Sequence, residues 1–282
     1  MPNILILASE TIGGAALLDV VRRRADQSDD PRFFVCVPQT RPRHGNVIYD
    51  NAVHDAAQVR VDLTTAFLRE LGVQGRGTVG DPDPFNAATD AIAEFDIDEV
   101  IVSTRPAPTS GWMRRDLPER IQQASGLPVE HVVVDIDSEG LPFDVTLVVA
   151  NQTVAGRELV ERLRQKGDEG PRRFIVIVPQ DSGDGSASLQ ARERLALLLS
   201  SLEESNLIAA GAISDPDPFT AIMNALQVFY ISEIVISTLP ENASRWLQKG
   251  LIDRVRRASG RPVEHVESST TPVEPAAAGG PA

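Results

Sequence analysis

The sequence predicts an α/β protein built from two tandem domains, each a five-stranded parallel sheet covered by helices on both faces. The first observation is an internal repeat: Asp-Pro-Asp-Pro-Phe at 81–85 recurs at 215–219, 134 positions later (215 − 81). Glu-Val-Ile-Val-Ser-Thr at 99–104 and Pro-Val-Glu-His-Val at 128–132 recur at the same offset. One offset shared by separate motifs indicates a duplicated domain. The second observation is that short apolar runs alternate with segments of helical periodicity.

The elements of the first copy follow from these patterns in order. A continuous apolar run at 4–8 predicts a strand, and the apolar positions of 15–21, after a Gly-Gly turn, predict a helix. A β-rich run at 33–37 ends at a proline, and 56–71 carries one apolar helical face.

The second half of this copy continues the alternation. We expect a strand at 75–79, then a helix that Asp81 or Asp83 caps, with prolines in its first turn. A strand at 100–102, a helix at 117–124 and a strand at 129–134 complete it. In the second copy the expected strands are 147–150, 174–178, 208–213, 234–236 and 263–266. Apolar strands separated by helices are typical of a parallel sheet that is buried on both faces.

The expected domains are 1–138 and 143–267, joined by a turn-rich linker at 137–142. Residues 268–282 have no periodicity and are predicted to be a disordered tail.

Composition excludes some functions. The net charge of −13 argues against a nucleic-acid partner. The single Cys36 lies in an apolar run, so we expect a buried thiol and no disulfide framework. No apolar run has the length of a membrane span, and the N-terminus lacks a signal-peptide pattern. We therefore expect a soluble cytoplasmic protein without a membrane partner.

Gly80-Asp81-Pro82 opens the third helix, Ser103-Thr104 ends a strand, and a short last helix precedes a Pro-Val strand. Together these three features resemble the universal stress protein domain. The resemblance covers both copies nearly end to end, so the chain is similar to a tandem universal stress protein. It implies an adenine-nucleotide-hydrolase-like topology, a role in stress response, and pairing of the two domains through their fifth strands as a pseudo-dimer. A homodimer is left open.

The resemblance also implies ATP binding, but the residues depart from the nucleotide-binding pattern. In such members the loop after strand four reads Gly, two residues, Gly, nine residues, then Gly with Ser or Thr. Pro106 falls on the second glycine and offers no N–H, and Asp116 falls on the third and brings a negative charge. The second copy retains only Gly250 of the three. The Asp that such members place after strand one is replaced by Ala8-Ser9-Glu10 and Ala150-Asn151-Gln152.

The predicted function is therefore a non-enzymatic stress-response binding or interaction module with degenerate nucleotide sites and no cofactor. One alternative is an ATP- or AMP-binding regulator with a nonstandard phosphate loop. Another is an enzyme of the wider adenine-nucleotide-binding group, for which only Gly13-Gly14 could grip a phosphate. A ligand would lie over the carboxyl ends of strands one and four, near these residues: Ser9, Ser103, Thr104, Arg105, Asn151, Ser237 and Thr238.

Other motifs leave two interpretations each. The Gly-x-Gly-x-x-Gly of 75–80 spans a strand, so we read it as coincidence and not as a dinucleotide site. Alternation puts Glu130 and His131 on opposite faces, which favours an interface role for His131 and His265 over a metal site. The tryptophans at 112 and 246 are buried anchors or stacking platforms. The loop 40–54, with two histidines, is a solvated loop or an anion clamp.

Overall fold

The computed structural model describes residues 1–39, 50–106, 116–153, 156–180, 185–240 and 244–268. The chain divides into two compact units. The first unit is Met1–Asp144 with Gln227–Tyr230, and the second is Val145–Leu226 with Ile231–Ala282. The domain limits expected from the sequence remain a prediction.

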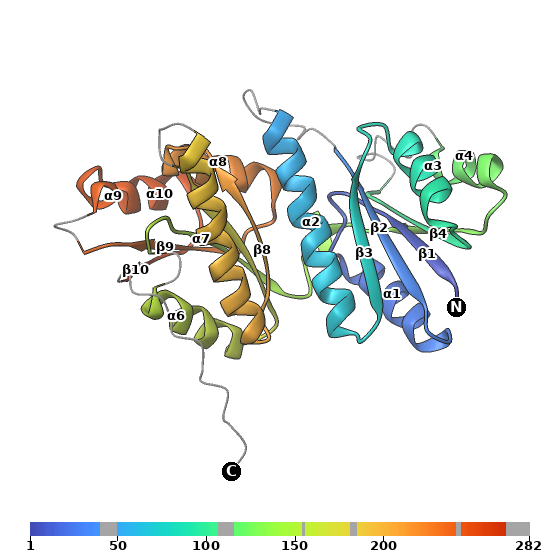
Figure 1. Ribbon diagram of the computed structural model, residues 1–282, viewed down its shortest axis with the longest axis horizontal. Coiled ribbons are helices and arrows are strands. Elements are labelled where there is room, and N and C mark those ends of the chain that lie inside the picture. The colour runs from blue at the N-terminus through green and yellow to red at the C-terminus, as the bar shows by residue number, and fades with distance from the viewer. Residues whose placement is uncertain (40–49, 107–115, 154–155, 181–184, 241–243, 269–282) are drawn as a thin grey trace, which may run out of the picture. The chain divides into compact units, whose positions relative to one another are not determined.

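The first unit alternates strands and helices (Figure 1). Its elements are β1 (Asn3–Leu7), α1 (Ala15–Gln27), β2 (Arg32–Pro38), α2 (Asp50–Glu70), β3 (Gln74–Gly80), α3 (Pro84–Phe95), β4 (Glu99–Thr104), α4 (Leu117–Ser125), β5 (Val129–Val133) and α5 (Ile136–Glu139). The strands form one parallel sheet in the order β3-β2-β1-β4-β5. Side chains of α1 and α2 pack in the core on one face, and those of α3 and α4 pack on the other.

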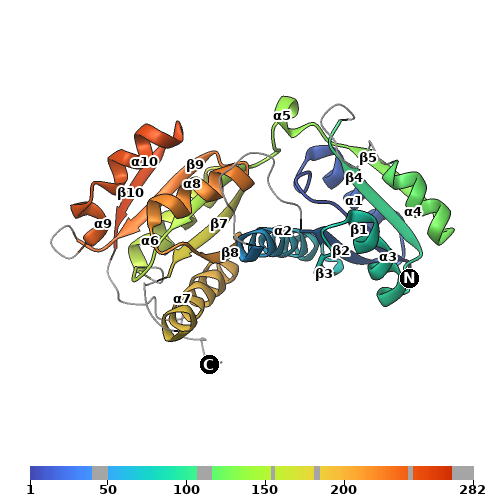
Figure 2. The same cartoon turned by 90° about the horizontal axis from the view of Figure 1, so that it is seen from above.

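The second unit has the same strand order, β8-β7-β6-β9-β10. Its elements are β6 (Asp144–Val149), α6 (Arg157–Asp168), β7 (Arg172–Pro179), α7 (Gly185–Glu204), β8 (Ile208–Ser214), α8 (Pro218–Val228), β9 (Glu233–Thr238), α9 (Arg245–Gln248), α10 (Leu251–Ser259) and β10 (Val263–Glu267). Figure 2 shows α7 and α10 on opposite sides of this sheet. The predicted α/β fold with two five-stranded parallel sheets is confirmed.

The repeated Asp-Pro-Asp-Pro-Phe motif builds the start of a helix in each unit. The carboxylate of Asp83 accepts hydrogen bonds from the backbone N–H groups of Phe85 (2.9 Å) and Asn86 (3.4 Å), so Asp83 is the cap and not Asp81. The Phe85 ring then lies 4.3 Å from the guanidinium of Arg120 on α4. In the second unit Asp217 caps α8 in the same way, and Phe219 lies 4.3 Å from Arg254.

The glutamates of the other two repeated motifs share one cation in each unit, which is partly buried in the first unit and buried in the second. Arg24 of α1 lies 2.6 Å from Glu99 at the start of β4 and 2.8 Å from Glu130 of β5. In the second unit Lys166 of α6 takes this place. Its ammonium is 2.8 Å from Glu233 and 3.0 Å from Glu264, and the residue is only 3% exposed.

The histidine of each Pro-Val-Glu-His-Val strand contacts the threonine that ends the neighbouring strand. Nε2 of His131 lies 2.8 Å from Oγ1 of Thr104, and His265 repeats this contact with Thr238 at 2.8 Å. Since Glu130 pairs with α1 while His131 contacts Thr104, the expected placement on opposite faces holds. All three repeated motifs therefore have internal partners that hold the fold together.

Several smaller expectations met different outcomes. The Gly-x-Gly-x-x-Gly stretch lies in β3, as expected, and pairs with β2. The linker is not only turns, because α5 occupies Ile136–Glu139. His54 lies in α2 and not in a loop, whereas the other loop histidine falls outside the described residues.

Cys36 is buried, and burial, with Asp90 and Glu94 nearby, raises the pKa of its thiol to about 12. Among the helices of the described residues, none combines the length and apolarity that a membrane crossing requires.

Candidate functional site

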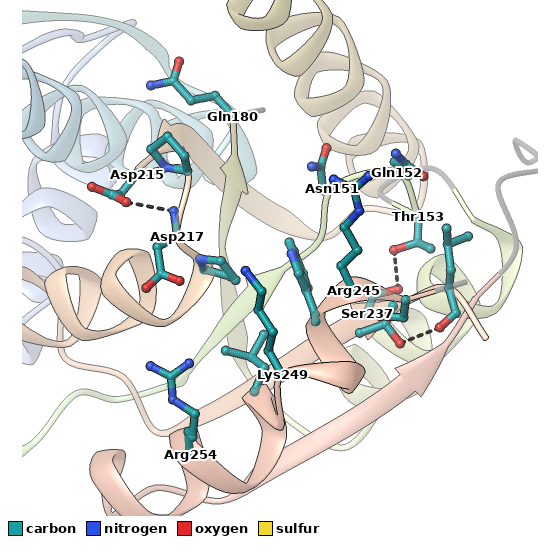
Figure 3. Close-up of a pocket in the computed structure, with 17 residues that line it drawn as sticks. Asn151, Gln152, Thr153, Gln180, Asp215, Asp217, Ser237, Arg245, Lys249 and Arg254 are labelled. Carbon is teal, nitrogen blue, oxygen red and sulfur yellow. Dashed lines mark hydrogen bonds between the residues drawn. The ribbon is translucent and has the colours of Figure 1, made fainter. Parts of the chain in front are cut away.

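A pocket of about 870 Å³ lies in the second unit, at the carboxyl ends of β6 and β9 (Figure 3). Carboxyl ends of parallel strands are where open α/β sheets bind ligands. Four segments line the pocket: the turn 151–153 after β6, the turn 215–218 before α8, the end of β9 at 237–239, and the stretch from Ser244 through α9 to Arg254 of α10. Gln180 completes the wall after β7.

Basic side chains give this pocket its charge. Arg245, Lys249 and Arg254 line it from the α9–α10 side, and Figure 3 shows Asp215 and Asp217 on another wall. Within the described residues, neither Arg245 nor Lys249 forms an ion pair, whereas both aspartates accept hydrogen bonds from backbone N–H groups of their own turn. The pocket thus carries three basic and two acidic side chains on different walls, and the basic wall can meet an anionic group, in a chain whose net charge is −13.

Trp246 adds an aromatic surface to the same wall. Its indole is partly exposed and lines the pocket, so it is not the fully buried anchor that the sequence favoured. An indole at a pocket wall offers a planar group a stacking surface. The other tryptophan, at 112, falls outside the described residues.

The hydroxyl and amide groups predicted as site residues line this pocket, but they are engaged by the protein. Ser237 donates to Oγ1 of Thr153 at 2.9 Å, and both side chains are buried. Thr238 donates to the carbonyl of Leu239 at 2.8 Å. Asn151 accepts a hydrogen bond from Arg194 at 2.5 Å. They line the pocket, and its positive charge comes from the α9–α10 segment.

The turn that begins the last helix has the same backbone in both units. Gly250 precedes α10 with φ 62° and ψ 34°, and Asp116 precedes α4 with φ 45° and ψ 45°. Neither residue makes a side-chain cap, so among the described residues the first N–H groups of both helices lack this acceptor. The position is a glycine without charge in the second unit and an aspartate in the first.

The first unit places its predicted site residues at the equivalent strand ends. Ser9, Ser103 and Thr104 are all buried. Oγ1 of Thr11 donates to the carbonyl of Ser103 at 3.3 Å, and the Ser103 hydroxyl has no hydrogen-bond partner among the described residues.

Arg105 is held by carboxylates of its own unit. Its Nη1 lies 3.1 Å from Glu10, and its Nη2 donates to Asp137 of α5. The hydroxyl of Tyr230, a residue that belongs to this unit, accepts from Arg105 and donates to Asp137. The guanidinium that the sequence nominated for a ligand is therefore already paired.

Two side chains of the same unit pack closely against the Gly13-Gly14 turn after β1. A Cβ added to Gly14 would come within 2.1 Å of Val134, and one on Gly13, which has φ 93°, within 2.9 Å of Phe143. The tight-turn interpretation explains this pair, because the space beside it is filled by Val134 and Phe143.

The two histidines do not join a cluster of metal ligands. Among the described residues, no three His, Cys, Asp or Glu side chains gather so as to hold a metal ion. Burial lowers the pKa of His131 and of His265 below the usual value of 6.5. In the second unit the Thr238 hydroxyl donates elsewhere, so Nε2 of His265 carries the proton that this contact requires.

Sequence reasoning missed the three basic residues of the pocket. Arg245 and Lys249 lie in a stretch without clear periodicity, and α9 was not predicted. The available signal was a concentration of basic residues ahead of the last helix of an acidic protein. The loop proposed as an anion clamp, 40–54, lies outside the described residues as far as residue 49.

Comparisons with known proteins do not show a family for this chain. No family model matches the chain, and no curated protein matches it significantly. Among solved structures, a universal stress protein from Archaeoglobus fulgidus DSM 4304 aligns over 94% of this chain and 96% of its own, with 15% identity and a TM-score of 0.36. Histidinol dehydrogenase from Elizabethkingia anophelis aligns over 94% of this chain and 52% of its own, with 12% identity and a TM-score of 0.27. The E. coli ADP-heptose lps heptosyltransferase II aligns over 94% and 84%, with 14% identity and a TM-score of 0.28. All three TM-scores are below 0.5, so we infer neither family nor activity from these alignments. The fold itself is shown by the two parallel sheets.

Proposed function

We propose that the chain is a non-enzymatic, universal-stress-protein-like binding module of stress response, and that its second unit binds a small organic anion. One observation carries the ligand proposal: Arg245, Lys249 and Trp246 line a pocket at the carboxyl ends of β6 and β9. Two cations that have no carboxylate partner among the described residues favour an anionic group, and a neighbouring indole favours a planar one.

The state of the polar groups supports the non-enzymatic part. A nucleophilic hydroxyl requires a base within hydrogen-bond reach. Ser237 instead donates to Thr153, and Thr238 donates to a backbone carbonyl, with His265 donating to it. Asp215 and Asp217 accept hydrogen bonds from their own turn. These bonds suit a binding wall better than a proton relay.

Adenine nucleotides are the specific alternative ligand. Gly250 supports this candidate, because it retains the third glycine of the nucleotide-binding pattern at an uncapped helix start beside Lys249. ATP or AMP would then be held through a nonstandard loop, since Pro240 has no N–H. We otherwise propose that no cofactor is bound.

The interaction role rests on the sheet edges. Strands β5 and β10 are terminal in their sheets, so each has a row of backbone groups without a partner in its own sheet. Pairing through fifth strands, within one chain or between two chains, remains our proposal for how the module assembles.

Isothermal titration with AMP and ATP tests the ligand proposal. We expect binding by the intact protein and at least a tenfold loss in Lys249→Glu and in Arg245→Glu. Arg257→Glu is the matched control, because this exposed arginine also lies on α10 but does not line the pocket. Equal affinity in all three variants, or no binding of either nucleotide or of inorganic phosphate, would remove the proposal. Conversion of ATP to ADP that Thr238→Val abolishes would contradict the non-enzymatic assignment.

A further inference from the structure

The first unit contains a guanidinium that its own chain has neutralised. Arg105 follows β4 directly and is about one-fifth exposed, with a side-chain exposure of 21%. Glu10, from the turn after β1, lies 3.1 Å away, and Asp137, from α5, accepts from the other terminal nitrogen. Two carboxylates on one guanidinium satisfy the fork of donors with which arginine binds oxyanions.

The equivalent positions in the second unit are neutral. Leu239 is the counterpart of Arg105 at the repeat offset of 134 (239 − 105). Gln152 is the counterpart of Glu10 at the offset of 142 that relates the first strands of the two copies (152 − 10). Both line the pocket of the second unit. The two opposite charges of Glu10 and Arg105 are both replaced by neutral side chains in the second unit. This joint replacement indicates that the two residues act as a pair, and that the fold is compatible with a charged or a neutral pair at these positions.

A second feature lies at the same strand end. The hydroxyl of Ser103, two residues before Arg105, is buried, with the residue 1% exposed, and it has no hydrogen-bond partner among the described residues. Its counterpart Ser237 donates to Thr153, whereas Thr11 uses its hydroxyl on the Ser103 carbonyl. A buried hydroxyl without an acceptor is costly, and a bound group can supply one.

We propose that Arg105 is the centre of a latent oxyanion site in the first unit, and that Glu10 and Asp137 occupy it in place of an external phosphate or carboxylate. Asp137 is the displaceable member, because its side chain is 55% exposed and it lies on the short helix α5 that follows β5. The Tyr230 hydroxyl, which contacts both Arg105 and Asp137, completes the arrangement. The site is distinct from the pocket of the second unit and does not rest on the function proposed for it.

Titration with inorganic phosphate, followed by NMR on backbone amides, tests this site. In the intact protein we expect little response at residues 9–11 and 103–105. In Glu10→Gln/Asp137→Asn we expect saturable shifts there with at least a tenfold gain in affinity. Adding Arg105→Leu to this variant should abolish the response. Gln at position 10 is the residue that the second unit already carries at 152.

The outcomes separate this proposal from the function of the second unit. A response at residues 9–11 and 103–105 of the double variant, without any response at Lys249, would show that the pocket of the second unit does not bind phosphate and would support the latent site. No gain in the double variant, or a gain that persists without Arg105, would overturn the latent site whatever the second unit does. If the double variant does not fold, Asp137→Asn alone decides, since this exposed residue can be neutralised without disturbing the core. It should show a smaller gain of the same kind, and none would again overturn the proposal.

Discussion

The hydroxyl of Thr104 lies 2.8 Å from Nε2 of His131, and the Thr238 hydroxyl lies 2.8 Å from Nε2 of His265. Each contact joins the end of one strand to the edge strand beside it. Two motifs that recur along the sequence thus meet in space twice, once in each unit. The sequence suggested an interface or metal role for these histidines, and the structure gives them a partner inside their own sheet.

This contact predicts a loss of stability in mildly acidic solution. Burial lowers the pKa of both histidines, so between their folded pKa and the usual 6.5 the unfolded chain binds more protons than the folded one. Their contribution is therefore fully present above pH 6.5 and lost as the pH falls through the folded pKa. Urea unfolding at pH 7.5 and pH 5.5 should show a smaller free energy of unfolding at pH 5.5. The double variant His131→Gln/His265→Gln should reduce that difference, and an unchanged difference would contradict this cause.

The hydroxyls have a smaller and pH-independent effect. Thr238→Val removes the acceptor for His265 and the donor to the Leu239 carbonyl while keeping the side-chain shape. We expect the free energy of unfolding to fall by about 1 kcal/mol, the usual net value of such a hydrogen bond. Chemical denaturation at pH 7.5 measures it. A free energy of unfolding equal to that of the intact protein would contradict a stabilising contact.

The buried lysine of the second unit's ion network predicts a larger loss. Lys166→Met removes the shared partner of Glu233 and Glu264. Because Arg172 still pairs with Glu233 and Arg162 with Glu264, neither carboxylate is left unpaired, and we expect a loss of about 2 kcal/mol, the usual value of a hydrogen bond to a charged group. Burial alone would raise the pKa of Glu233, but hydrogen bonds from Lys166 and Thr146 hold it below 4.5. This stabilisation is present above pH 4.5 and lost below it. The free energy of unfolding should therefore fall less in the variant than in the intact protein as the pH is lowered below 4.5. Lys166→Arg is the matched control, because the first unit has Arg24 there, and it should cost under 1 kcal/mol. Equal losses in both variants would contradict the pairing.

The fold could be predicted because its signals are local and occur twice. The apolar runs of β1, β4 and β6 are buried on both faces, so they are continuous in the sequence. Carboxyl ends of adjacent parallel strands meet at one edge, which is why the sequence could place Ser237 and Thr238 at that edge of the sheet, where they line the pocket.

The charge of the site could not be predicted, because it depends on long-range partners. Arg105 looked available to a ligand, but Asp137 reaches it from 32 positions away, through a helix that the sequence did not reveal. Lys249 lines a pocket only because α9 ends there and Gly250 turns the chain into α10. Neither relationship leaves a periodic pattern.

The packing at the first turn predicts a steric effect. Gly14→Ala would place a Cβ 2.1 Å from Val134, and such overpacking costs about 2 kcal/mol. Thermal or chemical unfolding should show this loss, and the double variant Gly14→Ala/Val134→Ala should lose less than the sum of the two single variants. Additive losses would mean that Val134 is not the obstacle. Gly72→Ala is unsuitable as a control, since its φ of 73° adds backbone strain.

The matched stacking pairs separate a structural role from a binding role. Arg120 over Phe85 and Arg254 over Phe219 have the same geometry, each guanidinium 4.3 Å from its ring centre. Each pair should contribute about 0.5–1 kcal/mol to stability, so Arg120→Leu and Arg254→Leu should lower the free energy of unfolding alike. Only Arg254 lines the pocket of the second unit, so only its variant should weaken AMP or phosphate binding, by about tenfold, or 1.4 kcal/mol. Titration calorimetry beside urea unfolding measures both quantities on the same samples. Arg120 does not line the pocket, so any weakening of binding in Arg120→Leu would come from its loss of stability. If Arg120→Leu and Arg254→Leu weaken binding equally, the anion is therefore not held by the α10 side of the pocket.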